Sequence, residues 1–154
     1  MFAYDGSDLA EHAIAEAGRL FAASNHDALV LTVWQPFDVG FVPAGELEFD
    51  AAQVREVKQA ARATAAAGAS LATTAGFQAE SAEVEAAPIW KGIADFADHH
   101  DARLIVLGSH GRSGLGRLFG SVAAAVAAHS RRSVLIVHHP AEPEADGGTD
   151  VPPG

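Results

Sequence analysis

The 154-residue chain contains 49% hydrophobic and 19% charged residues, which is typical of a globular protein. Its net charge of −10 argues against a nucleic-acid surface, since such a surface needs clustered Lys and Arg. No apolar run is long enough to span a membrane, and the lack of cysteine excludes disulfides and fits a cytoplasmic protein. We therefore expect one cytoplasmic domain, residues 1–139, followed by a disordered acidic tail, residues 140–154.

The beginning of the chain reads as a very short strand followed by a helix. Residues 1–4 form the strand, and residues 5–7 form a strand-to-helix turn. Either Ser7 or Asp8 is placed to cap the helix, with Glu11 placed to complete a capping box with Asp8. The apolar residues of the following helix fall on one stripe, which indicates a core-facing side.

The middle of the chain continues this alternation. An apolar run at 28–34 predicts a buried strand, and residues 37–49 predict a loop without a clear period. Residues 50–75 predict a long helix that frays near Gly68, and residues 77–85 predict the third strand.

The last part of the chain supplies two more strand and helix pairs. Pro88 fits the first turn of a helix that ends at His100, and residues 104–107 form a short, fully apolar strand. An alanine-rich helix opens at Ser121, and residues 133–137 form the fifth strand. The order β-α-β-α-β-α-β-α-β predicts an α/β domain with a parallel sheet.

Five glycines lie between the fourth strand and the last helix, from Gly108 to Gly120. A glycine-rich connection into a helix N-terminus favours anions, because free N–H groups and the helix dipole both attract negative charge. The Walker loop does not fit, because no lysine follows Lys91, and the dinucleotide fingerprint has the wrong glycine spacing. A phosphate site and a purely structural loop therefore both remain open.

The motif residues resemble a known family. The run LIVLGSHGRSGLGRLFGSV at 104–122, the run SVLIV at 133–137 and the residues Tyr4-Asp5-Gly6-Ser7 closely resemble the universal stress protein family, over roughly residues 1–138. The resemblance implies a three-layer α/β/α fold of the adenine nucleotide alpha hydrolase type. Its five-stranded parallel sheet would have the order 3-2-1-4-5, so strands one and four would place Asp5 and Gly108 at one switch point.

The resemblance also implies ATP as the ligand. The ATP-binding members carry glycine, two residues, glycine, nine residues, then glycine with Ser or Thr. Here Gly108 and Gly111 match the first pair and Gly120-Ser121 match the last, but only eight residues separate the two parts. The candidate nucleotide-binding residues are Ala3, Tyr4, Asp5, Val33, Gly108, His110, Gly111, Arg112, Gly120, Ser121 and Val122.

These residues have different expected roles. Val33 would read adenine through its backbone, and Ser121 would donate its hydroxyl and N–H to phosphate. Asp5 would border the nucleotide or serve only as a turn residue, while His110 and Arg112 would supply charge or simply be solvated. A Mg or Mn ion would be held mainly by phosphate oxygens, and no other metal site is expected, because no side-chain set has ligand spacing.

The sequence therefore favours an ATP-binding regulatory protein of the universal stress type. One alternative is a nucleotide-free dimer that acts through protein contacts, which the shortened loop supports. Another is a slow ATPase, although only Asp5 or His110 could act as its general base. The apolar fifth strand, 133–137, predicts a homodimer, because an open apolar edge invites pairing with another chain.

Overall fold

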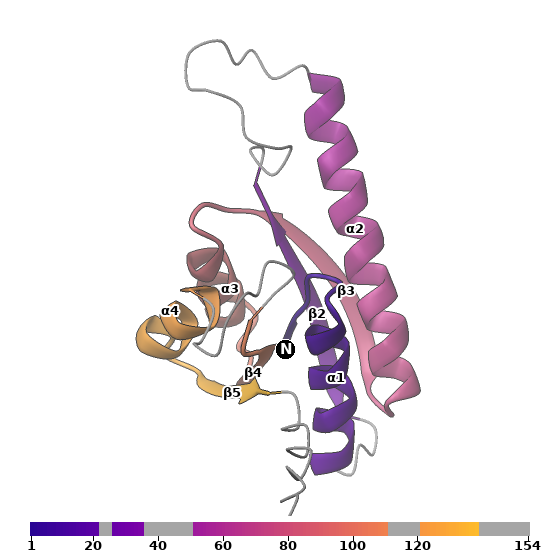
Figure 1. The fold of residues 1–154 in the computed structure, drawn as a ribbon, viewed down its shortest axis with the longest axis vertical. Helices are drawn as coiled ribbons and strands as arrows, with labels where there is room; N and C mark the ends of the chain where they lie inside the picture. Colours follow the sequence, from indigo (N-terminus) through magenta and orange to yellow (C-terminus); the bar gives the residue numbers. More distant parts are fainter. Residues whose placement is uncertain (22–25, 36–50, 111–120, 139–154) are drawn as a thin grey trace, which may run out of the picture.

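In the computed structural model, helices cover both faces of a central sheet (Figure 1). The structure describes residues 1–21, 26–35, 51–110 and 121–138. The loop predicted at 37–49 and the tail at 140–154 lie outside these residues. Within the described part, the elements are β1 Phe2–Ala3, α1 Asp8–Leu20, β2 Asp27–Trp34, α2 Ala51–Thr74, β3 Gln78–Glu85, α3 Ile89–His99, β4 Leu104–Gly108, α4 Ser121–His129 and β5 Ser133–Val137.

The sheet is all parallel and has the order β3-β2-β1-β4-β5, which confirms the predicted topology. β1 lies at the centre, where Phe2 pairs with Val30 of β2 on one side and with Val106 of β4 on the other. Because the strands are parallel, all five carboxyl ends share one edge. Among the residues that the structure describes, none of the helices combines the length and the apolar character of a transmembrane span.

Two hydrophobic cores lie on opposite faces of the sheet. One contains Ile14 of α1 with Phe2 and Val30, and the other contains Ile93 of α3 with Leu31 of β2. The side chains of successive β2 residues alternate between the two cores. This explains why the central strands are almost entirely apolar, since both of their faces are covered.

The turn after β1 is fixed by its own hydrogen bonds. Ser7 is the N-cap of α1 and its hydroxyl accepts from Ala10 N at 3.2 Å, while the Asp5 carboxylate accepts from Ser7 N at 3.0 Å. Gly6 adopts a φ of +78°, which favours glycine. The predicted box between Asp8 and Glu11 is wrong, because Ser7 takes the cap position.

Helix α2 does not fray at Gly68 as expected, but continues to Thr74. Gly68 is buried, and a Cβ there would lie 2.6 Å from Tyr4 Cδ1 and 2.8 Å from Val30 Cγ1. The glycine therefore allows the helix to approach the sheet closely. From the sequence, Gly68 indicated a weak point in the helix, because glycine has a low helix propensity. In the structure, its lack of a side chain allows close packing.

Helix α3 is tied to the start of β5 by Arg132. The Nε of Arg132 donates to the Asp98 carboxylate at 2.7 Å, and its terminal nitrogen donates to the Asp98 carbonyl at 3.1 Å. Pro88 is the N-cap of α3, one position before the predicted first turn. These contacts fix the edge strand β5 against the helix layer.

Candidate functional site

The candidate site lies where β1 and β4 end side by side. The helix that follows β1 packs on one face of the sheet, and α4, which follows β4, packs with α3 on the other. Chains leaving the two strands therefore diverge, which is the switch point at which open α/β sheets bind ligands. The topology brings Asp5 and Gly108 to this point, as the sequence predicted.

The backbone of Tyr4 bonds to β2, whereas its side chain packs into the core beneath α1 and α2. Its carbonyl accepts from the Thr32 hydroxyl at 2.9 Å, and its N–H donates to Leu31 O at 2.9 Å. Its ring is buried in the α1/α2 core, and its hydroxyl donates to Glu11 Oε1 at 3.3 Å. Burial, followed by the nearby Glu11 carboxylate, raises the pKa of Tyr4. Only the backbone of Tyr4 faces the switch point.

The backbone of Val33 points toward β1. Leu31 O accepts from Tyr4 N on the β1 side of β2, whereas Trp34 O accepts from Ala86 N on the β3 side. Backbone groups of successive strand residues face opposite neighbours, so the N–H and C=O of Val33 face the β1 side. β1 ends at Ala3, whose partner is Leu31, so the Val33 groups lie beyond the end of β1.

The backbone of Gly108 approaches the same place from β4. Val106 N donates to Met1 O, so every second residue of β4, including Gly108, faces β1. A Cβ on Gly108 would lie 2.9 Å from Leu9 Cγ and 3.3 Å from His110 O. Gly108 therefore has a packing role against α1, beside any role in ligand binding.

Ser109 and His110 follow β4 directly. Ser109 is 3% exposed, its N–H donates to Val137 O at 2.8 Å, and its hydroxyl lies 3.1 Å from His110 Nδ1. This contact holds the half-buried imidazole at the carboxyl edge. Sequence reasoning passed over Ser109; the only signal was a small polar residue directly after a buried strand.

Of the remaining candidate nucleotide-binding residues, two lie within the described part of the chain and three lie outside it. α4 begins at Ser121, as predicted, and Val122 is half-buried against the core under α3 and α4. Gly111, Arg112 and Gly120 lie outside the described residues. Within the described ranges, no group of three or more His, Cys, Asp or Glu side chains could hold a metal ion.

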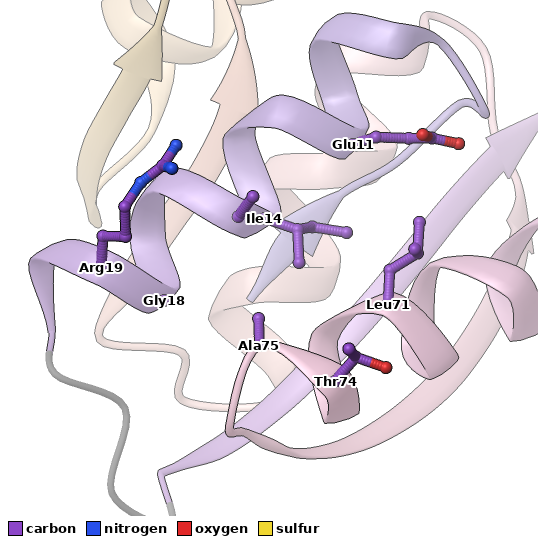
Figure 2. Close-up of a pocket in the computed structure, with 8 residues that line it drawn as sticks. Glu11, Ile14, Gly18, Arg19, Leu71, Thr74 and Ala75 are labelled. Carbon is purple, nitrogen blue, oxygen red and sulfur yellow. The ribbon is translucent and has the colours of Figure 1, made fainter.

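A separate hollow lies between α1 and α2 (Figure 2). Its volume is about 450 Å³, and its lining is largely apolar, with Ile14 and Leu71 on facing helices. Figure 2 shows Glu11 and Arg19 toward opposite ends of it. The hollow lies along the helix faces rather than at the carboxyl edge, so it is not the candidate site.

The strand order and the adjacent ends of β1 and β4 define a doubly wound α/β domain with a switch point between these two strands. The model of the universal stress protein family matches residues 1–138, and the chain belongs to this family. Among curated proteins, no sequence match was found.

Solved structures of the same family are similar in fold. A universal stress protein in complex with cAMP is 32% identical, with a TM-score of 0.64 over 90% of this chain and 96% of its own. The Archaeoglobus fulgidus universal stress protein in complex with dAMP is 27% identical, with a TM-score of 0.54 over 88% and 93%. An Arabidopsis thaliana family protein with AMP bound is 15% identical, with a TM-score of 0.59 over 90% of each chain, which bears on the fold alone.

Proposed function

We propose that this protein binds an adenine nucleotide, ATP in particular, at the carboxyl ends of β1 and β4, and acts as a regulatory protein. The observation that carries the proposal is the direction of the Val33 backbone. Its N–H and C=O face the β1 side, beyond the last paired residue of β1. Adenine offers a ring-nitrogen acceptor beside an amino donor, so one such residue can bond both.

The relatives support adenine as the base. Two universal stress proteins of 32% and 27% identity were solved with cAMP and dAMP, respectively. Both ligands contain adenine and phosphate, the two groups that the switch point would have to accept. ATP itself is the finer proposal, and it follows from the glycine pattern at Gly108, Gly111 and Gly120.

The phosphates would lie toward the N-terminus of α4. This helix begins at Ser121, and the free N–H groups of its first turn favour anions. His110, held by Ser109, stands on the β4 side of the same edge. A Mg or Mn ion would be held mainly by phosphate oxygens, with the carboxylate of Asp5, in the turn after β1, as a nearby protein ligand.

Calorimetric titration tests the proposal directly. ATP and AMP, each with and without magnesium, should bind the parent protein, and mass spectrometry should detect adenine nucleotide released on denaturation. Val33→Pro removes the N–H that faces β1 without touching the β3 side, whereas Val33→Ala keeps it. Binding that survives in Val33→Pro as well as in Val33→Ala would contradict the assignment of Val33.

The second proposal is a homodimer through β5. Val137 O accepts from Ser109 N, so odd residues of β5 face β4, and the backbone groups of Val134 and Ile136 face the open edge. Open apolar edges favour pairing with another strand. A protein that neither retains nor binds nucleotide, yet remains dimeric, would favour the nucleotide-free dimer over the ATP-binding form.

A further inference from the structure

Two polar side chains are buried in the part of the chain that the structure describes, and both lie toward the carboxyl edge of the sheet. They belong to Thr32 and Ser109, which are 7% and 3% exposed. The Thr32 hydroxyl donates to the carbonyl of Tyr4 at 2.9 Å, across 28 positions of sequence. A buried hydroxyl needs a partner, and this one takes a backbone acceptor at the end of β1.

The carbonyl of Tyr4 could also accept from a backbone N–H of β2. In a parallel ladder, a residue of one strand donates to the residue before its partner and accepts from the residue after it. Leu31 pairs with Ala3 and accepts from Tyr4 N, so the next residue of β2 that faces β1 is Val33. In a continued ladder, Val33 N–H would donate to Tyr4 O.

The ladder stops before this bond forms. Among the described residues, the pairing of β1 with β2 ends at Ala3 and Leu31, and the Tyr4 carbonyl accepts from Thr32 instead. The turn at Gly6 then leads the chain away into α1. Within the described part of the chain, the Tyr4 carbonyl thus accepts from the hydroxyl of Thr32, and no hydrogen bond joins it to the N–H of Val33.

We infer that Thr32 is a positioning residue for the nucleotide site, because its hydroxyl holds the Tyr4 carbonyl turned away from the Val33 N–H, which is left directed at the ligand. The part that concerns the ligand rests on the proposed function above. The competition between Thr32 and Val33 for one carbonyl is a property of the ligand-free chain. Thr32 itself does not touch the nucleotide.

Two substitutions separate the hydroxyl from the shape of the side chain. Thr32→Val removes the donor at nearly equal volume, and Thr32→Ser keeps the donor with less volume. Thr73→Val is the matched control, because the Thr73 hydroxyl donates to Ala69 O within α2 at 2.9 Å, away from the carboxyl edge. All three variants would be made in the full chain.

The first measurement is amide hydrogen exchange of Val33 without ligand, followed by NMR. In Thr32→Val the Tyr4 carbonyl is released and can turn toward the Val33 N–H, so exchange of the Val33 amide should slow by about tenfold, as expected for one new hydrogen bond. Thr32→Ser and Thr73→Val should exchange as the parent does. An unchanged Val33 amide in Thr32→Val would overturn the inference.

The second measurement is calorimetric titration with AMP and, separately, with tripolyphosphate. Thr32→Val should weaken AMP about tenfold, Thr32→Ser should stay within about threefold of the parent, and tripolyphosphate affinity should not change. Equal losses of AMP and tripolyphosphate would indicate general distortion and would overturn the positioning role. If the parent binds no adenine nucleotide, the proposed function fails, while the exchange measurement still decides whether Thr32 and Val33 compete.

Discussion

The ring of Tyr4 occupies the space that a side chain on Gly68 would need. A Cβ at Gly68 would lie 2.6 Å from Tyr4 Cδ1 and 2.9 Å from Tyr4 Cγ. Helix α2 is therefore in contact with the residue that leads β1 into the candidate site. Glycine inside a helix normally costs about 1 kcal/mol relative to alanine, and here the close contact offsets that cost.

Gly68→Ala should destabilise the protein, although alanine is the better helix former. The added methyl group would overlap the Tyr4 ring and Val30 Cγ1 in a packed core, and overpacking of this kind costs about 1–3 kcal/mol. Urea denaturation followed by circular dichroism measures the free energy of unfolding. Ala66→Gly, on the exposed side of α2, is the control for propensity alone. A stabilised Gly68→Ala protein would contradict the packing argument.

Gly108→Ala should also lower stability, by about 1–3 kcal/mol, whether or not nucleotide is present. The reason is the 2.9 Å approach of its Cβ to Leu9 Cγ. A double-mutant cycle with Leu9→Ala tests this, because the second substitution removes the obstructing atom. The double variant should lose less stability than the sum of the two single losses. Simple additivity would show that Leu9 is not the cause.

Stability should rise with pH between about 6 and 8 because of the Met1 amino group. In the 154-residue chain this group donates to Leu104 O at 2.8 Å, and burial lowers its pKa from 8.0 to about 6. The unfolded chain then binds more protons than the folded one, so the free energy of unfolding falls as pH drops through this range. The effect is at most about 2–3 kcal/mol.

N-terminal acetylation isolates this contribution from the histidines, which titrate in the same range. The acetylated chain keeps an N–H for Leu104 O but has no charge to bury. Urea denaturation at pH 6 and pH 8 should show a smaller rise in stability for the acetylated protein than for the free one. Equal rises in both would show that the Met1 ammonium is not the source.

The β5 edge can be tested with a matched pair of substitutions at Ile136. Ile136→Pro removes an N–H that faces the open edge, whereas Ile136→Ala removes more of the side chain but keeps the N–H. Light scattering should report a monomer for Ile136→Pro and a dimer for Ile136→Ala and the parent. Circular dichroism confirms that both variants are folded. A dimeric Ile136→Pro protein would place the interface elsewhere.

The helices and strands could be predicted from the sequence because their signals were periodic and local, whereas the order of the strands in the sheet followed from the family resemblance and the handedness of the crossovers. The apolar runs at β2, β4 and β5 and the alanine-rich start of α4 at Ser121 each needed only neighbouring residues to be recognised. The error at Gly68 arose because a glycine that weakens an isolated helix can admit an aromatic ring from another element. That partner, Tyr4, is distant in sequence.

The candidate site was less predictable for the same reason. Asp5 and Gly108 could be brought together from strand order alone, but the contact of Thr32 with the end of β1 could not be recognised. Its partner, the Tyr4 carbonyl, is determined by where the β1–β2 ladder stops. The sequence pattern indicated either a phosphate site or a structural loop at Gly108, but nothing in it reveals how closely Gly108 approaches Leu9.

The two outer strands of the sheet differ in charge. β3 carries Glu80, Glu83 and Glu85, whereas β5 contains no charged residue. A pair of chains joined through β5 would thus present only acidic borders, and two such borders repel each other. The sheet would then extend across one dimer and no further. The acidic strand β3, at the edge opposite β5, would thus oppose growth into fibres.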